Sequence, residues 1–274
     1  MGRPYAEVIG DPIAHSKSPT IHNFWLKKLG IDGEYRTCHV RPDELADYFA
    51  RRREDAEWRG CNVTIPHKTA AARFADDVEA DVVEIGATNC LFRRDESLQA
   101  TNTDCTAVVA AFEVFDPPFC LVGNGGAARA AFAALDPIRA EWLHLLVRNE
   151  AAGHRMIESM APLEGTVFGF DRINECIEGC NGLINATSLG MAGQSPMPAA
   201  ILNAIPTLAP GALVFDMVYA PLRTQLLARA EAAGLRCIDG LTMLIGQAAA
   251  AFKLFFGQPA PRQHDAELRA LLTS

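Results

Sequence analysis

The sequence predicts an α/β protein with two domains, the second of which is a doubly wound, Rossmann-like fold. Three observations predict this class. The chain has 274 residues, more than one hydrophobic core usually holds. Short apolar strands alternate with amphipathic helices along most of its length. A glycine-rich turn at 123–126 joins an apolar strand directly to an alanine-rich helix.

The first hundred residues alternate between strands and helices. Residues 5–10 are predicted to form a short apolar strand, 18–30 an amphipathic helix and 34–40 a second strand. A Pro-Asp turn opens a helix over 42–54, and residues 60–66 follow as a third strand. Because helices between strands favour parallel pairing, we expect a parallel α/β sheet in this part of the chain.

A second unit begins near Phe119. A strand, a glycine turn and a helix occupy 118–135, and further strands are predicted at 142–149, 182–190 and 212–220. Strands and helices in this order predict a right-handed, doubly wound sheet.

The C-terminal segment is predicted to contain one long apolar helix over 241–257 and a short final helix over 264–274. A terminal helix this apolar needs a surface to cover, so we expect it to pack on the first domain. The predicted division is therefore 1–105 plus 240–274 for one domain and 106–239 for the other.

Composition and charge exclude several classes of function. The formal net charge of −8 argues against nucleic acid or an anionic membrane as a partner. The first residues, MGRPYAEVIGDP, lack the apolar run of a secretory signal, and no stretch approaches the roughly 20 apolar residues that span a membrane. The eight cysteines are scattered, without zinc-site spacing, which predicts reduced thiols and no metal. We expect a cytoplasmic protein that acts on a small molecule.

The glycine turn fits the dinucleotide-binding pattern G-x-G-x-x-G/A. The first glycine permits a tight turn, the second lets backbone amides approach a pyrophosphate, and Ala128 lets the helix lie close to the strand. The pyrophosphate would lie at the positive end of this helix. The alternative is a simple strand-to-helix turn. The residues expected to contact the cofactor here are Gly123, Asn124, Gly125, Gly126 and Ala127.

The choice between NADP and NAD is expected at the end of the next strand. An acidic residue there would bind the ribose 2′-hydroxyl of NAD, but this strand ends Val147-Arg148-Asn149. Arginine pairs well with a 2′-phosphate, so Arg148 favours NADP. A solvent-facing arginine is the alternative, and the nearby Glu150 leaves NAD open.

Three short segments carry more polar groups than a core needs: residues 15–19, 62–68 and 101–104. Each has a purely structural explanation when taken alone. Ser16 or Ser18 could cap a helix, Lys68 could be a solvated lysine, and Asp104 could cap the helix that follows.

Together these segments resemble the shikimate dehydrogenase family over nearly the whole chain. The motifs that carry the resemblance occur in the family's order and spacing: GDPIAHSKSPTIHN, CNVTIPHK, GATN, NTD, VGNGGAARA, INATSLGM, DMVYAPLRTQLL and DGLTMLIGQAAAAF. The resemblance implies that the first domain, with the last helices, binds substrate and that the middle domain binds NADP. It also implies an oxidoreductase that reduces the ring ketone of 3-dehydroshikimate with NADPH, in chorismate and aromatic amino acid biosynthesis.

The resemblance implies a role for each matching residue. Lys68 and Asp104 correspond to the catalytic pair, and Ser16 and Ser18 to the residues that bind the substrate carboxylate. The residues that would line the ring hydroxyls are Thr64, Asn89, Tyr219 and Gln247. Further residues implied for the cofactor are Thr187, Met217 and Gly240.

The chemistry agrees with these roles. Hydride delivery to a ketone builds negative charge on its oxygen, so a nearby ammonium group stabilises that charge and can donate the proton. A carboxylate beside the lysine would orient it and bind a neighbouring hydroxyl. No metal is required.

Some positions depart from the family's pattern. Cys105 and Thr242 replace glycines, and Asn124 replaces a small apolar residue. Val147 and Ala152 stand where the family's NADP-binding strand end usually carries asparagine and a second arginine, a role that Arg155 could take.

Two alternatives to an NADP-dependent shikimate dehydrogenase stay open. One is a quinate/shikimate dehydrogenase that uses NAD, which Arg148 disfavours. The other is a catalytically idle paralogue that binds dinucleotide, which should have lost Lys68 or Asp104. A folate dehydrogenase of similar two-domain shape would not account for the SKSP and NTD segments. A monomer and a homodimer are equally compatible with the sequence.

Overall fold

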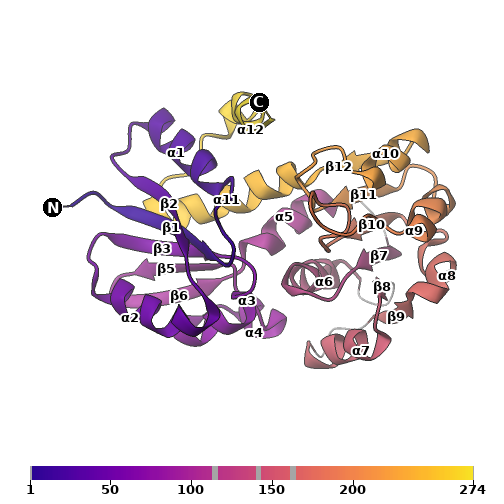
Figure 1. The fold of residues 1–274 in the computed structure, drawn as a ribbon, viewed down its shortest axis with the longest axis horizontal. Helices are drawn as coiled ribbons and strands as arrows, with labels where there is room; N and C mark the ends of the chain where they lie inside the picture. The colour runs from indigo at the N-terminus through magenta and orange to yellow at the C-terminus, as the bar shows by residue number, and fades with distance from the viewer. Residues whose placement is uncertain (1, 113–116, 140–142, 161–164, 274) are drawn as a thin grey trace. The chain divides into compact units, whose positions relative to one another are not determined.

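The chain divides into two compact units, shown in the computed structural model of Figure 1, which describes residues 2–112, 117–139, 143–160 and 165–273. The first unit comprises residues 1–103 with 245–274, and the second comprises 104–244. The chain passes between them inside α5 (Thr103–Phe112) and inside α11 (Gly240–Phe256). The sequence analysis placed these crossings at 105/106 and 239/240. A crossing inside a helix leaves no change of composition to mark its position.

The first unit is built on a six-stranded sheet. Its strands are β1 (Tyr5–Gly10), β2 (Glu34–His39), β3 (Trp58–Val63), β4 (Asp77–Val78), β5 (Cys90–Arg94) and β6 (Ser97–Thr101). Its helices are α1 (Ser18–Leu29), α2 (Leu45–Glu54), α3 (Lys68–Ala71), α4 (Ala80–Ile85), most of α11, and α12 (Asp265–Thr273). Residue 274 of the predicted final helix lies outside the described residues.

The parallel pairing predicted for the first three strands is confirmed, since β1 pairs in parallel with β2 and β3, but the whole sheet is mixed. The strand order is β2-β1-β3-β5-β6-β4, and β5 pairs antiparallel with both β3 and β6. The sequence analysis missed the β5–β6 hairpin because its two-residue turn, Asp95-Glu96, contains no glycine. Asp95 nevertheless adopts a φ of 55° there.

This hairpin determines where the loops beside it lie. Asn62 near the end of β3 is opposite Cys90 at the start of β5, and Cys90 is opposite Thr101 at the end of β6. The segment before β5 and the segment after β6 therefore reach the same edge of the sheet as the carboxyl ends of β1 and β3.

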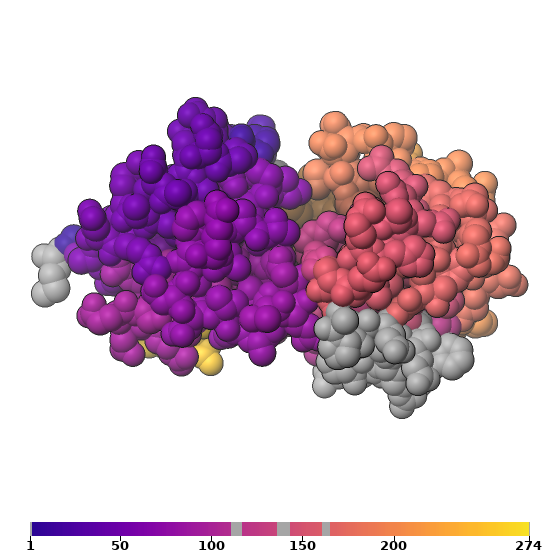
Figure 2. All heavy atoms as spheres, turned by 90° about the horizontal axis from the view of Figure 1, so that it is seen from below, coloured from indigo at the N-terminus to yellow at the C-terminus, as the bar shows by residue number. Residues whose placement is uncertain are grey.

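Helices cover both faces of the first sheet. Tyr5 and Ile9 of β1 pack with Tyr48 and Phe49 of α2 on one face. On the other face, Ala6 and Val8 of β1 and Tyr35 of β2 pack with Ala251 and Phe255 of α11. The prediction that the long apolar helix packs on the first domain is confirmed. In Figure 2 the atoms of the C-terminal residues, in yellow, emerge at one edge of this unit.

The second unit is also built on a six-stranded sheet. Its strands are β7 (Phe119–Val122), β8 (Leu143–Val147), β9 (Thr166–Gly169), β10 (Gly182–Asn185), β11 (Leu213–Asp216) and β12 (Arg236–Ile238). Its helices include α5, α6 (Gly126–Arg139), α7 (Glu150–Ser159), α8 (Ile173–Ile177), α9 (Ala199–Ala204) and α10 (Gln225–Ala232). Residue 142 of a predicted strand lies outside the described residues.

The second sheet is fully parallel, in the order β12-β11-β10-β7-β8-β9. Chain order thus reverses between β7 and β10, which is the doubly wound arrangement that the sequence predicted. Residues of α6 and α7 pack on one face of the sheet, and residues of α8, α9 and α10 pack on the other. In such sheets, ligands bind beyond the carboxyl ends of the strands at the point of reversal.

Of the helices in the described part of the chain, none is long and apolar enough to cross a membrane.

Gly60 in β3 lies directly against β5 and α11. Its φ is 149°, and a Cβ there would lie 2.7 Å from the Phe255 ring and 2.8 Å from the Phe92 Cα. Only glycine therefore lets β5 and α11 pack on β3 at this point.

Gly60→Ala is expected to lower the free energy of unfolding of the first unit by about 3 kcal/mol, because it adds both backbone strain and steric overlap. The matched control is Gly30→Ala at the end of α1, where φ is 65° but no atom lies within 4 Å of the new Cβ. That change should cost about 1 kcal/mol. Denaturant unfolding of both variants is the measurement, and equal losses would contradict this account of Gly60.

Candidate active site

Four of the predicted site residues follow the parallel strands β1 and β3. Ser16 and Ser18 lie in the loop and first turn after β1, and Thr64 and Lys68 lie just after β3. Because β1 and β3 are neighbours in the sheet, their carboxyl ends open on the same edge. The Thr64 amide donates to the Ile9 carbonyl at 3.0 Å, which ties the two strand ends together.

The loop 86–89 joins the lysine segment to the segment before Asp104. The Thr88 amide donates to the main-chain carbonyl of Lys68 at 2.8 Å. On the other side, the Thr88 hydroxyl donates to the Thr101 carbonyl at 2.6 Å, and the Asn102 side-chain amide donates to the Ala87 carbonyl at 3.0 Å. The loop therefore fixes the main chain both at Lys68, the first residue of α3, and at the end of β6.

A buried amide at the end of this loop fixes the start of α5. The Asn89 Oδ1 atom accepts a hydrogen bond from the Thr103 amide at 2.7 Å. The Thr103 hydroxyl reaches the Oε1 of Gln247 on α11 at 3.5 Å. On the opposite side, the Asn62 amide donates to the Asn89 carbonyl at 3.2 Å, and the Tyr35 hydroxyl donates to Asn62 Oδ1 at 2.7 Å. All five side chains are buried. Two predicted site residues, Asn89 and Gln247, thus belong to one buried polar network.

The local surroundings of these polar residues leave both their structural and their functional explanations open. The N-cap of α1 is Lys17, which has no side-chain capping bond, so neither serine caps that helix from the N-cap position. The Ser16 hydroxyl accepts from the Ser18 amide at 3.3 Å. Asp104 lies inside the first turn of α5, which begins at Thr103. Lys68 is half-buried, and is therefore not a fully solvated lysine.

In the second unit the glycine loop lies at the point where strand order reverses. Gly123 follows β7 with a φ of 114°, and a Cβ there would lie 2.7 Å from the Thr187 methyl group. Space around Gly125 is open, since a Cβ at this position would have no atom within 4 Å. Helix α6 begins at Gly126, and Ala128 is fully buried against the sheet. Each small residue therefore has the surroundings that the dinucleotide pattern requires.

A second buried network holds the neighbouring strand ends. Asp216 at the end of β11 accepts hydrogen bonds from the Asn185 side chain at 2.9 Å and from the Thr224 hydroxyl at 2.6 Å. Burial raises the pKa of Asp216, although these hydrogen bonds oppose the rise. The Asn185 Oδ1 in turn accepts from the Thr187 hydroxyl at 2.6 Å. This network fixes the position of Thr187 beside the glycine loop.

Two more predicted cofactor residues meet at the start of α11. A Cβ on Gly240 would lie 2.5 Å from the Met217 carbonyl oxygen, so only glycine permits this approach. Tyr219 follows in the same loop and is partly buried, which raises the pKa of its hydroxyl. Tyr219 and Asp104 lie in the second unit, whereas the other predicted substrate residues lie in the first.

The Arg148 side chain is exposed at the end of β8, beside β7. Within the described ranges no acidic side chain pairs with it. Asn149 is used locally, because its side chain accepts from the Ala152 amide at 3.1 Å and caps α7. Val147 is buried in the core. Its side chain therefore cannot assist Arg148 in holding a phosphate.

The sequence analysis gave no role to several residues that build these sites. They are Tyr35, Asn62, Thr88, Asn102, Thr103, Asn185, Asp216 and Thr224. Asn185 and Asp216 had a usable signal, since each is a polar residue that ends an otherwise apolar strand.

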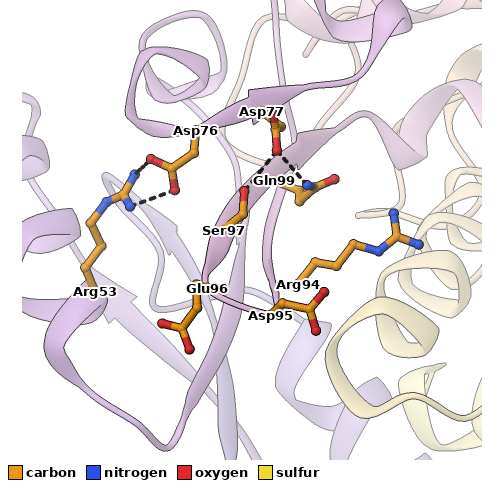
Figure 3. A pocket seen from close by; sticks show the side chains of 8 residues that line it. All are labelled: Arg53, Asp76, Asp77, Arg94, Asp95, Glu96, Ser97 and Gln99. Carbon is orange, nitrogen blue, oxygen red and sulfur yellow. Dashed lines mark hydrogen bonds and ion pairs between the residues drawn. The ribbon is translucent and has the colours of Figure 1, made fainter.

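One surface hollow lies away from these residues (Figure 3). It is formed by the β5–β6 hairpin, β4 and the end of α2, and its lining residues are Arg53, Asp76, Asp77, Arg94, Asp95, Glu96, Ser97 and Gln99. Part of its polar lining is engaged internally. Arg53 donates to both Asp76 oxygens at 2.8 Å, and Asp77 accepts from Ser97 and Gln99 at 3.0 Å. No group of three or more His, Cys, Asp or Glu among the described residues could hold a metal ion.

Two family models match this chain, one in its N-terminal part and one in its C-terminal part. Residues 8–91 match the shikimate dehydrogenase substrate binding domain, and residues 240–267 match the shikimate 5′-dehydrogenase C-terminal domain. Two similar crystal structures are a shikimate 5-dehydrogenase from Listeria monocytogenes, in complex with shikimate and NAD, and one from Thermus thermophilus, in complex with NADP(H) and shikimate. The first has a TM-score of 0.87 and 28% identity and covers 98% of this chain and 96% of its own. The second has a TM-score of 0.82 and 29% identity and covers 98% and 99%.

A relative from Sphingopyxis alaskensis, a shikimate dehydrogenase (NADP(+)), is 48% identical over 275 residues. The alignment spans 99% of this chain and 97% of the relative. Identity at this level over nearly the whole of both chains shows that this protein belongs to the shikimate dehydrogenase family.

Proposed function

We propose that this protein reduces the ring ketone of 3-dehydroshikimate with NADPH to give shikimate, and catalyses the reverse oxidation with NADP. The first unit binds the substrate, and the second binds the cofactor. The protein acts in the cytoplasm on a small-molecule substrate, as a monomer or a homodimer. The observation that carries the proposal is the 48% identity to a shikimate dehydrogenase (NADP(+)) over nearly the whole of both chains.

The polar edge of the first sheet suits a carboxylated, hydroxylated ring. The Ser16 and Ser18 hydroxyls bind the carboxylate, since hydroxyl and amide donors can hold an anion on an acidic protein without a cation. The proposal assigns the ring hydroxyls to Thr64, Asn89, Gln247 and Tyr219. Buried amides in a connected network have fixed orientations, which gives selectivity for hydroxyl positions.

Lys68 is the proton donor in the reduction. NADPH supplies the hydride when it is bound. The Lys68 ammonium faces the ketone oxygen, stabilises the negative charge that develops there, and transfers a proton to it. Asp104 accepts a hydrogen bond from a neighbouring substrate hydroxyl and orients the ammonium group. In the reverse reaction Lys68 accepts the proton from the alcohol.

The second unit fits a dinucleotide phosphate. Gly123 and the open space around Gly125 allow backbone amides at the start of α6 to approach a pyrophosphate. The other cofactor contacts in this proposal come from the beginning of α6 and from the strand ends across the reversal point: Asn124, Gly126, Ala127, Thr187, Met217 and Gly240. Arg148 is exposed and has no acidic partner within the described ranges, so it is available to the 2′-phosphate.

An NAD-using quinate/shikimate dehydrogenase is the second candidate. The buried Val147 and the uncharged Ala152 favour it, because neither can bind a 2′-phosphate. The experiment that separates the candidates is cofactor reduction with shikimate and with quinate, each with NADP and with NAD. The proposal expects the highest kcat/KM for shikimate with NADP. Absence of turnover with all four pairs would contradict both candidates.

Lys68→Ala is expected to reduce kcat about a thousandfold, equivalent to about 4 kcal/mol of transition-state stabilisation, with little change in shikimate affinity. The fold should survive, because the Thr88 amide binds the main-chain carbonyl of Lys68, which alanine retains. Lys27→Ala, at an exposed lysine of α1, is the control and should leave kcat unchanged. Steady-state kinetics are the measurement. More than a tenth of the native kcat in Lys68→Ala would contradict its proposed role.

Arg148→Asp is expected to reverse the preference for NADP over NAD, because it removes a cation and adds an anion beside the 2′-phosphate. The native preference should be about tenfold, the low end of what an exposed arginine–phosphate contact provides. Titration of NADP and NAD against the native protein and the variant is the measurement.

Arg155→Asp on α7 is the matched variant, because Arg155 is also exposed and could hold the phosphate in place of Arg148. It should leave the preference unchanged. Equal affinities for the two cofactors in the native protein, unaltered by Arg148→Asp, would show that this strand end does not select the cofactor.

A further inference from the structure

Lys17 lies between the two serines proposed to bind the substrate carboxylate, yet its side chain turns to the far end of the chain. Its Nζ donates to the main-chain carbonyl of Leu272 at 2.6 Å, across 255 residues of sequence. Leu272 is in the last turn of α12, which ends at Thr273. Carbonyls in the last turn of a helix have no partner within that helix, so this bond satisfies one of them.

Electrostatics favour this position for the ammonium group. Lys17 is the N-cap of α1, where the helix dipole presents partial positive charge and disfavours a lysine cation. The C-terminal end of α12 presents partial negative charge and stabilises the same cation. The contact with α12 therefore draws the Lys17 side chain away from α1.

Helix α12 is anchored independently of Lys17. Its Leu268 and Leu272 side chains are buried, and Glu267 forms an ion pair with Lys28 of α1 at 2.7 Å. It can therefore serve as a fixed support for the Lys17 side chain.

The loop after β1 is tied at its start, where the Asp11 amide donates to the Ile65 carbonyl at 3.1 Å, but the bonds at the two serines are local. The Ser16 amide donates to the Ile13 carbonyl at 3.1 Å, and the Ser18 amide donates to the Ser16 hydroxyl at 3.3 Å. Apart from the main-chain bonds of α1, the hydrogen bonds of the two serines in the described part of the chain stay within 13–18, whereas the Lys17 side chain reaches α12. Lys17 thus supplies a long-range tie at the serine end of this loop, as Asp11 does at its start.

We propose that Lys17 is a positioning residue, which α12 holds so that Ser16 and Ser18 present their hydroxyls to the substrate carboxylate. The inference rests on the proposed function of the two serines. It assigns to the C-terminal helix a part in substrate affinity.

The test compares the native protein with Lys17→Met, Lys17→Arg and Lys28→Met. Lys17→Met removes the donor and keeps the length of the chain. It should raise the KM for shikimate about tenfold while kcat and the KM for NADP stay within about twofold. Lys17→Arg keeps a donor and should stay within about threefold of the native KM. Lys28→Met removes the other lysine contact to α12, and should lower thermal stability without changing the KM for shikimate.

A second measurement separates positioning from direct contact between Lys17 and the carboxylate. Amide hydrogen exchange at Ser16 and Ser18, without substrate, should be faster in Lys17→Met than in the native protein. An unchanged KM would overturn the inference, as would a raised KM with unchanged exchange. If the native protein does not oxidise shikimate, the proposed function fails, and the exchange result alone decides whether Lys17 holds the loop.

Discussion

The hydrogen bond from the Thr88 hydroxyl to the Thr101 carbonyl is the contact on which the first site depends. It closes loop 86–89 onto the end of β6, while the Thr88 amide holds the main chain of Lys68. The same loop carries Asn89, which fixes the amide of Thr103. A buried carbonyl without a partner would cost about 1–3 kcal/mol, so these bonds strongly restrict the loop. These neutral, buried hydrogen bonds therefore form a framework that fixes the main chain at Lys68 and just before Asp104.

In the second unit, too, buried hydrogen bonds hold the loops at the strand ends. Asn185 and Asp216 end two apolar strands, and Thr224 completes a buried network that orients Thr187 beside Gly123. In both units the side chains that hold the loops are buried, and Asn89 both holds a loop and is proposed to bind substrate, whereas Arg148 is exposed. Arg148 takes no part in these networks, so its substitution should leave the fold intact.

The sequence predicted most of the fold, because the glycine turn and the alternation of strands and helices are local signals. It did not predict the β5–β6 hairpin, since Asp95-Glu96 lacks the glycine that usually marks such a turn. The family motifs identified Lys68 and Asp104 as candidate catalytic residues. They did not show which hydrogen bonds hold the main chain around them. The partners of Thr88 and Asn89 are separated from them by 13 and 14 residues, and only the pairing of β5 with β6 brings them together. Lys17 and Leu272 lie farther apart still, at opposite ends of the chain.

We infer that this neutral framework, and not the charged residues alone, makes the site active. Turnover of shikimate by Thr88→Val tests it most directly, because valine keeps the shape of threonine, and Thr88 is not among the residues proposed to touch substrate or cofactor. The account predicts a fall in kcat of at least tenfold with an unchanged KM for NADP, since misplacement by about 1 Å can cost up to a hundredfold in rate. Thr88→Ser, which restores the hydroxyl, should recover most of the activity. Native kcat in a folded Thr88→Val protein would contradict the account.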